Sequence, residues 1–385
     1  MEAARFAVKS APLHFRGLQY LLLDHWPMSG APTSHQYFPL SPWAQADLQW
    51  WCTSSQITFT SAIRVPPVSL TYATDASLLG WGAVCGSHQL GGRWHPDEST
   101  HHINWLELRS VQLGLQTFAS TAHQISIRLE VDNVPTVAFL NRKGGTRSQP
   151  LCQLAQEIWQ WAIDRNLELI AVHVPGKENV DADFQSRHFQ RSTSDWMLDP
   201  ELFQELNRCL GPCQVDLFAA RHNCQLPTYC SWDRDPWATG IDAFSMPHLW
   251  ENGYAFPPFR LVGRCLQMAR TQQLHRLVLV APAWPNQPWY PVLLSMLVDY
   301  PVQLLSPTVV QGPDNEQHPL RHRLQLTAWV ISGSNSKSVA FQRTLPGCGV
   351  RHGGLPQIGR MTVPGESGTA GVVNGRLIHF TRLCR

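Results

Sequence analysis

Between residues 67 and 190, stretches typical of strands and stretches typical of helices alternate in an order that few folds accommodate. The strand-like runs VSLTYATD, GWGAVCG and QLGGRW come first and are followed by the helical INWLELRSVQLGLQTFAS. Then come the strand QISIRLEVDN, the helices VPTVAFLN and PLCQLAQEIWQWAIDR, the strand LELIAVHVPG and the short helix VDADFQSR. This order predicts an α/β fold with a mixed, five-stranded sheet and flanking helices.

Four acidic residues stand where these predicted strands end or helices begin. Asp75 ends the first strand, Glu107 lies near the start of the first long helix, Asp132 follows the fourth strand, and Asp183 opens the last helix. Strand ends and helix starts meet at one edge of a sheet, which is where α/β proteins usually build their sites. We therefore expect the four carboxylates to converge.

Converging carboxylates repel one another unless cations neutralise them. Oxygen-only ligands favour Mg²⁺ or Mn²⁺ over zinc. Two such ions about 4 Å apart suit in-line hydrolysis of a phosphodiester. The alternative for Asp75 is that it only ends a strand, with Gly80 and Gly82 shaping a hairpin.

Four sequence blocks occur in order and carry a specific resemblance: TDASLLGWGAV, INWLELRSVQLGL, EVDNVPTVAFLN and HVPGKENVDADFQSR. Over residues 67–190 they resemble the motif blocks of the ribonuclease H domain of reverse transcriptases. The residues of these blocks are most similar to those of DIRS-type (tyrosine-recombinase) retrotransposons. The resemblance implies an RNase H-like endoribonuclease that binds an RNA–DNA hybrid and cuts its RNA strand with two Mg²⁺ or Mn²⁺ ions, leaving 3′-hydroxyl and 5′-phosphate ends.

The resemblance also implies roles for individual residues. His173 matches a mobile histidine that assists proton transfer or product release, although a histidine at a strand end often only bonds a backbone carbonyl. The metal-binding catalytic acids would be Asp75, Glu107, Asp132 and Asp183.

Two positions near the last helix test this assignment. Asp181 is a near miss, because the spacing from Asn179 selects Asp183. Gln185 stands where the family usually has an apolar residue, which predicts that the last helix docks less firmly.

A basic stretch, NRKGGTRS, separates the two middle helices. We expect Arg142, Lys143 and Arg147 to contact phosphates of the duplex, since the two glycines let the backbone approach closely. The alternative is that these three residues form a solvated charge cluster.

The regions on either side suggest further parts. Residues 1–66 hold two short helical patterns and resemble a reverse transcriptase thumb and connection remnant, so a separate polymerase domain would be a partner. Residues 196–305 predict a second, smaller α/β domain that resembles phage-like adenine-N6 DNA methyltransferases. Its Phe256-Pro257-Pro258-Phe259 begins with Phe where those enzymes use an Asp or Asn acceptor, so we expect no methyltransferase activity. Residues 306–385, rich in Gly, Pro, Ser and Thr, predict a low-order tail.

Composition excludes little. With 43% hydrophobic and 15% charged residues the chain is globular, and a net charge of +2 neither requires nor excludes nucleic acid. We find no secretory signal and no apolar stretch suited to a membrane span, which predicts a cytoplasmic or nuclear protein. Two main functions are left: the endoribonuclease, or a catalytically silent, retrotransposon-derived nucleic-acid-binding protein. A third, a methyltransferase, would require residues 196–305 to bind S-adenosylmethionine.

Overall fold

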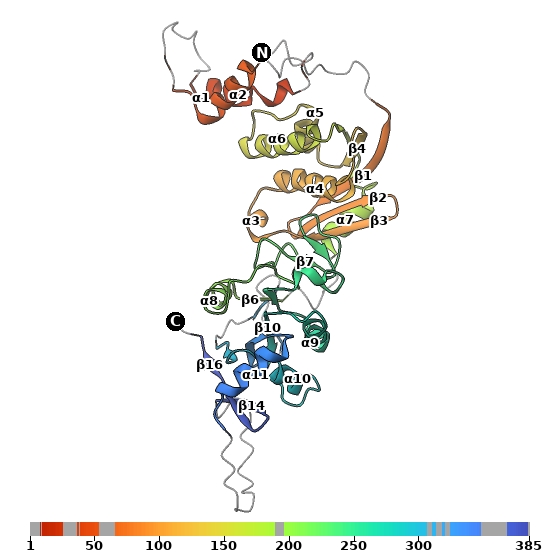
Figure 1. Ribbon diagram of the computed structural model, residues 1–385. Helices are drawn as coiled ribbons and strands as arrows, with labels where there is room; N and C mark the ends of the chain where they lie inside the picture. Colours follow the sequence, from red (N-terminus) through yellow and green to blue (C-terminus); the bar gives the residue numbers. More distant parts are fainter. Residues whose placement is uncertain are drawn as a thin grey trace, which may run out of the picture. The chain divides into compact units, whose positions relative to one another are not determined.

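The computed structural model describes residues 8, 10–25, 37, 39–53, 66–188, 196–305, 310–312, 318–319, 324–347 and 368–383. The chain divides into two compact units, Met1–Phe189 and Gln190–Arg385 (Figure 1). Among the helices that the structure describes, none has the length and the apolar run that crossing a bilayer requires.

The described elements of the first unit follow the order that the sequence predicts, with one additional short helix, α3. They are a 3₁₀ turn at Ala11–Leu13, α1 (Arg16–His25), α2 (Pro42–Cys52), β1 (Val68–Ala76), β2 (Gly80–Cys85), β3 (His88–Arg93), α3 (Pro96–Ser99), α4 (Ile103–Phe118), β4 (Ser126–Val131), α5 (Val134–Asn141), α6 (Gln149–Ile163), β5 (Glu168–His173) and α7 (Val180–Arg187).

The sheet of this unit has five strands in the order β3-β2-β1-β4-β5. Its β1-β2-β3 half is antiparallel, because short turns connect those strands, whereas β1, β4 and β5 run parallel. Parallel neighbours need long crossover connections, and α4, α5 and α6 lie within those connections. The predicted mixed, five-stranded sheet with flanking helices is confirmed.

Alternation along β1 sends successive side chains to opposite faces of the sheet. Tyr72 packs against α4, where its hydroxyl donates a hydrogen bond to the Val111 carbonyl at 2.8 Å. Asp75 faces the other way, in register with Gly82, and that face is covered by α7. The strand therefore gives its apolar residues to the core and its aspartate to the face beneath α7.

Two glycines let α7 approach the sheet closely. A Cβ atom on Gly82 would lie 2.2 Å from the Ala182 carbonyl oxygen, and one on Gly91 would lie 2.6 Å from that of Gln185. Gln185 itself donates a hydrogen bond to the Gln89 side chain at 2.9 Å. The close backbone approach over the glycines places α7 against the sheet, and the looser docking expected from Gln185 stays a prediction.

The N-terminal segment belongs to the same compact unit as residues 67–188. Leu13 is buried in the core that also holds Leu129 and Trp159. The Gln156 amide on α6 donates a hydrogen bond to the Leu13 carbonyl at 2.5 Å. The expected boundary at residue 66 thus does not separate two compact bodies.

The second unit contains short strands, helices and a larger sheet. Its described helices and strands are β6 (Met197–Leu198), α8 (Pro200–Leu210), β7 (Cys230–Ser231), β8 (Gly240–Ile241), β9 (Gly253–Ala255), α9 (Val262–Thr271), β10 (Leu277–Pro282), α10 (Tyr290–Ser295), β11 (Val302–Gln303), β12 (Val310–Gln311), β13 (Leu326–Ile331), α11 (Asn335–Thr344), β14 (Thr369–Val373), β15 (Arg376–His379) and β16 (Thr381–Arg382), with 3₁₀ turns at Ala243–Ser245, Pro247–Leu249 and Phe259–Leu261.

The larger sheet has the order β16-β11-β13-β10-β9. All residues of β10 and β13 are buried. Leu277 and Leu279 pack into one hydrophobic cluster, and Val278 and Val280 into another. Both faces of the sheet are therefore covered, as in other buried α/β sheets.

This architecture corrects two expectations. The second unit is not smaller, since residues 190–385 are the longer of the two ranges. The stretch expected as a low-order tail supplies β13, which pairs with both β10 and β11, and it also supplies α11 and β14. A six-residue apolar strand lies among Gly, Pro and Ser there, so overall composition concealed it.

Candidate active site

Three of the predicted acids meet at the edge of the first sheet. Asp75 is near the end of β1, Asp132 directly follows β4, and the register pairs Thr74 with Val131. These neighbouring parallel strands therefore end side by side, and Glu107 reaches the same point from α4. One carboxylate oxygen from each of Asp75, Glu107 and Asp132 lies within 4.8 Å of the other two.

Glu107 is the most enclosed of the three. Its side chain is only 5% exposed, and it accepts a hydrogen bond from the Ala76 backbone N–H. Its Oε2 atom is also buried but has no hydrogen-bond partner among the described residues. A buried oxygen without a donor is costly unless a ligand satisfies it.

The protonation of the cluster reflects this enclosure. Burial raises the pKa of Glu107 to about 9, and the charges of Asp75 and Asp132 contribute to that rise. Burial also raises the pKa of Asp75 to about 6, although the Ser186 hydroxyl works in the opposite direction. For Asp132, burial and the charge of Asp183 raise the pKa. A bound cation would offset both the desolvation cost of these carboxylates and their mutual repulsion.

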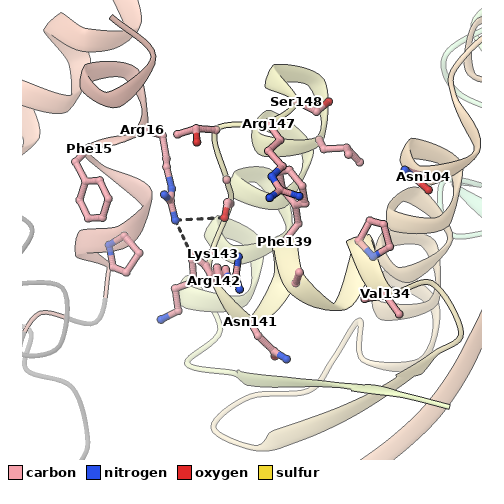
Figure 2. A pocket seen from close by; sticks show the side chains of 17 residues that line it. Phe15, Arg16, Asn104, Val134, Phe139, Asn141, Arg142, Lys143, Arg147 and Ser148 are labelled. Atoms are coloured by element: carbon pink, nitrogen blue, oxygen red, sulfur yellow. Dashed lines mark hydrogen bonds between the residues drawn. The ribbon is translucent and has the colours of Figure 1, made fainter. Parts of the chain in front are cut away.

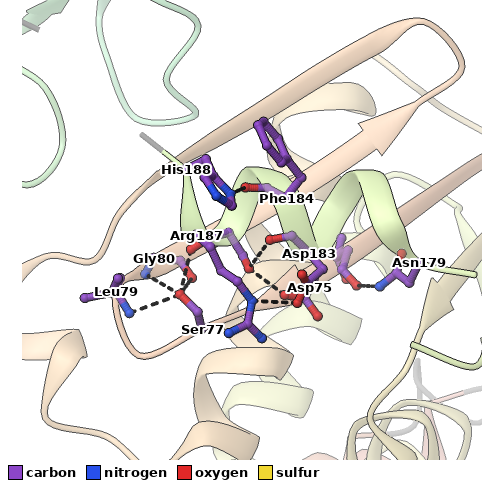
Figure 3. Close-up of polar contacts among 11 residues, drawn as sticks. Asp75, Ser77, Leu79, Gly80, Asn179, Asp183, Phe184, Arg187 and His188 are labelled. Atoms are coloured by element: carbon purple, nitrogen blue, oxygen red, sulfur yellow. Dashed lines mark hydrogen bonds and ion pairs between the residues drawn. The ribbon is translucent and has the colours of Figure 1, made fainter. Parts of the chain in front are cut away.

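Asp183 lies beside the cluster but is engaged differently. Its Oδ1 atom forms an ion pair with the Nε atom of Arg187, one turn later on α7, at 2.6 Å (Figure 3). Both side chains are about half exposed, at 44% and 53%. The structure thus brings three of the four predicted acids into the metal-sized group and places the fourth next to it.

Hydrogen bonds from both ends of α7 reach β1. The Ser186 hydroxyl donates to Asp75 Oδ2 at 2.6 Å, and the Asn179 amide donates to the Thr74 carbonyl at 2.9 Å (Figure 3). Sequence reasoning used Asn179 only as a spacing marker and missed Ser186 and Arg187. Their positions three and four residues after Asp183 are the signal, since such residues share its face of the helix.

His173 ends β5 and is exposed. Its Nε2 atom lies 3.1 Å from the backbone oxygen of Asp132. This is the carbonyl contact that the sequence left open as an alternative, and it also places the imidazole next to one of the clustered acids.

The predicted basic residues lie in the turn between α5 and α6. Arg142 and Arg147 are exposed, and the Lys143 ammonium lies 4.4 Å from the centre of the Trp159 ring. All three residues line a cavity of about 1180 Å³ (Figure 2).

In the second unit, Phe256 follows β9, and the tetrad Phe256-Pro257-Pro258-Phe259 lines a cavity of about 250 Å³. Asp216 is only 2% exposed. It accepts hydrogen bonds from the Phe218 N–H at 3.3 Å and from the Gln225 N–H at 3.0 Å. The backbone therefore satisfies this carboxylate.

Comparisons with known proteins give only partial similarities. No protein-family model and no curated protein matches the chain. Among solved structures it is similar to RNase H1 from Halobacterium salinarum NRC-1 (18% identity, 92% of that chain, TM-score 0.25) and to LC11-RNase H1 in complex with an RNA/DNA hybrid (17%, 93%, 0.25). It is also similar to the N-terminal RNase H domain of rv2228c from Mycobacterium tuberculosis, fused to maltose-binding protein (16%, 95%, 0.24). Each similarity covers 30% of this chain.

Proposed function

We propose that this protein is a metal-dependent endoribonuclease that hydrolyses the RNA strand of RNA–DNA hybrids. The observation that carries the proposal is the group formed by Asp75, Glu107 and Asp132, which each bring one carboxylate oxygen within 4.8 Å of the other two. Their carboxylates come from β1, α4 and the end of β4, so the fold itself brings them together. The four sequence blocks that contain these acids support the hybrid as substrate.

The residues present fit divalent cations. The donors are all carboxylate oxygens, which Mg²⁺ and Mn²⁺ prefer, and the buried Oε2 atom of Glu107 lacks a donor among the described residues. We propose that Asp75, Glu107, Asp132 and Asp183 hold two ions. When bound, such ions lower the pKa of water and stabilise charge on the leaving oxygen.

The chain's own residues then have separate tasks. The Ser186 hydroxyl holds Asp75 Oδ2, so the orientation of that carboxylate is set before substrate arrives. Water adds its oxygen to phosphorus while the bond from phosphorus to the 3′ oxygen breaks. The 3′ oxygen takes up a proton, and the ends are a 3′-hydroxyl and a 5′-phosphate. His173, exposed beside Asp132, is placed to take or deliver a proton at its ring nitrogen or to assist product release.

Substrate binding would use the basic turn. We propose that Arg142, Lys143 and Arg147 contact duplex phosphates, which position a nucleic acid without reading its sequence. A reverse transcriptase polymerase domain would be a natural partner for a nuclease of this kind.

A silent nucleic-acid-binding protein of retrotransposon origin is the alternative, and one observation favours it. Asp183 is paired with Arg187 at 2.6 Å and lies outside the group of three acids. If that pair never opens, the second ion has one ligand fewer. For the second unit we propose a methyltransferase-like fold without activity, because Phe256 has no acceptor for a target amine.

The test is cleavage of a labelled RNA–DNA hybrid by the full chain with Mg²⁺, with Mn²⁺ and with EDTA. We expect metal-dependent cutting of the RNA strand only, and loss of cutting in Asp75→Asn and in Asp132→Asn. Both variants should keep their stability, since each removes one of several repelling charges. A folded wild-type chain that binds the hybrid with either metal and leaves it intact would favour the silent alternative.

A further inference from the structure

The cavity beside the basic turn has two walls that are far apart in the sequence. One wall is the turn at residues 142–148, and the other includes Pro12, Phe15 and Arg16 from the N-terminal segment (Figure 2). At about 1180 Å³ the cavity is large for a drug-sized ligand. An extended, charged polymer is a better match for such a space than a small molecule.

Charge around this cavity has a single sign. Its described lining residues include Arg16, Arg142, Lys143 and Arg147, and none of these lining residues is Asp or Glu. Cations gathered in a concave surface attract polyanions and raise their local concentration. Gly144 and Gly145 also line it, which leaves the backbone accessible to a ligand at close range.

The other end of the cavity leads toward the acids. Asn104 and Val134 line it there. The Asn104 side-chain oxygen accepts a hydrogen bond at 3.1 Å from Asn133, the residue that follows Asp132. Asn104 is also one turn ahead of Glu107 on α4. One continuous strand could therefore lie across the acids and along this cavity.

The N-terminal helix α1 holds the basic turn in its conformation. Arg16 donates hydrogen bonds to the Arg142 carbonyl at 2.7 Å and to the Gly144 carbonyl at 3.2 Å. The Tyr20 hydroxyl donates to the Gly145 carbonyl at 3.0 Å. The turn includes two left-handed residues, Lys143 at φ 52° and Gly144 at φ 106°, a conformation that needs support from its surroundings.

We propose that this cavity binds the phosphate backbone of the RNA–DNA hybrid, with Arg16 as the positioning residue that fixes the cationic turn. The proposal rests on the proposed function for the identity of the duplex. Arg142 and Arg147 supply the charge for the phosphates. Arg16 donates hydrogen bonds to the backbone carbonyl oxygens of the turn, so that these partly negative oxygens do not repel a phosphate bound there.

The experiment measures hybrid binding by the full chain in EDTA, with fluorescence anisotropy as the readout, over a range of salt concentrations. The double variant Arg142→Gln/Arg147→Gln should bind at least 10-fold more weakly. Its plot of log affinity against log salt should flatten by about 0.7–0.9 for each phosphate that the variant no longer neutralises. The matched control is Arg128→Gln, which removes an arginine that pairs with Glu130 on β4, away from the cavity, and should leave the slope unchanged.

Arg16 is tested by two substitutions and a neighbour. Arg16→Gln and Arg16→Lys should both weaken binding several-fold. Lysine keeps the charge but loses the planar guanidinium, in which one nitrogen donates to the Arg142 and Gly144 carbonyls while the other donates to Gln19. Tyr20→Phe should have a smaller effect in the same direction, with an unchanged melting temperature. Full binding by Arg16→Lys would overturn the positioning role, and an unchanged salt slope in the double variant would overturn the site.

Failure of this proposal differs from failure of the proposed function. A chain that binds the hybrid through the cavity in EDTA, yet does not cut it with Mg²⁺, keeps the binding site and loses the nuclease. A chain that cuts the hybrid equally well with and without Arg142 and Arg147, at low substrate concentration, keeps the nuclease and loses the cavity.

Discussion

Asp75 in the first unit and Asp216 in the second are both buried aspartates, and burial raises the pKa of each to about 6. Their neighbours differ. Both oxygens of Asp216 accept backbone N–H groups. Asp75 receives one bond from the Ser186 hydroxyl and faces Glu107 and other acids. Backbone donors therefore satisfy Asp216. Asp75 instead belongs to a group of acids that has more carboxylates than hydrogen-bond donors.

The difference shows why a perturbed carboxylate alone is a weak marker of function. Desolvation is the largest cause of the shift at both sites, so the pKa values cannot separate them. What separates the two sites is the supply of hydrogen-bond donors. Both oxygens of Asp216 accept backbone N–H groups, whereas the Oε2 atom of Glu107, beside Asp75, has no donor among the described residues. We therefore regard the unmet acceptor, together with the neighbouring charges, as the mark of a cation site.

The largest effect should come from Glu107→Gln. Loss of a metal ligand should lower hybrid cleavage by more than about 100-fold, since even outer-shell partners of metal ligands commonly cost about 10–100-fold. Without metal, the variant should be at least as stable as the wild type, because a buried, repelled carboxylate has gone. Gel-based cleavage and thermal unfolding in EDTA measure the two effects. Mg²⁺-dependent cutting at the wild-type rate would show that Glu107 is not a metal ligand.

Asp216→Ala should give the opposite pattern. Two buried N–H groups, those of Phe218 and Gln225, would lose their acceptor, at roughly 1–3 kcal/mol each. The free energy of unfolding of the second unit should fall by about 2–6 kcal/mol, while hybrid cleavage persists. Denaturant unfolding measures this change, and Asp216→Asn is the matched control with a smaller loss. Unchanged stability in Asp216→Ala would mean that the contrast between the two aspartates is false.

A third effect is the pH dependence of stability without metal. The pKa of Glu107 is about 9 in the folded chain, against an ordinary value of 4.5, so between these values the folded state binds more protons than the unfolded state. Stability should therefore rise as the pH is lowered from about 8 to about 6, and fall as it is raised.

Thermal unfolding in EDTA measures this slope, which should flatten in Glu107→Gln. Stabilisation by added Mg²⁺ should be greater at about pH 8 than at about pH 6, because the metal needs ionised ligands. A slope of equal size in the variant would assign the effect to other groups.

The smallest effect should come from Arg187→Gln. Removing a cation that pairs with Asp183 and lies near Asp75 and Asp132 should raise the affinity for Mg²⁺ a few-fold. Melting temperature titrated against Mg²⁺ in the absence of substrate gives that affinity. Arg165→Gln, on the turn after α6, is the control. Weaker Mg²⁺ binding in Arg187→Gln would show instead that the arginine holds Asp183 in its productive position.

Much of the first unit could be predicted from the sequence. Alternation in VSLTYATD and helical spacing in INWLELRSVQLGL depend on local residues, so the sheet and its helices followed directly. The convergence of Asp75, Glu107 and Asp132 followed from their places at strand ends and on a helix. The ion pair between Asp183 and Arg187 is equally local, at four residues apart on one helix, although the sequence analysis did not predict it.

Other features depend on contacts between distant segments. Nothing near Arg16 indicates that its partners are carbonyls of residues 142 and 144, so the sequence predicted that residues 1–66 lie outside the domain of residues 67–190. In the second unit the strand LTAWVI lies within a stretch whose Gly, Pro and Ser content predicts a tail. Its burial comes from pairing with β10 and β11, which no local pattern reveals.

The place of β13 also decides when the second unit can fold during synthesis. β13 is inserted between β10 and β11, although both of those strands precede it in the chain. Until residue 331 has left the ribosome, one edge of the fully buried strand β10 has no partner. An unpaired apolar edge is a template for aggregation. The first unit, whose last described element ends at Arg187, can fold long before that, so a nascent chain would carry a finished first unit while the sheet of the second unit still lacks its central strand.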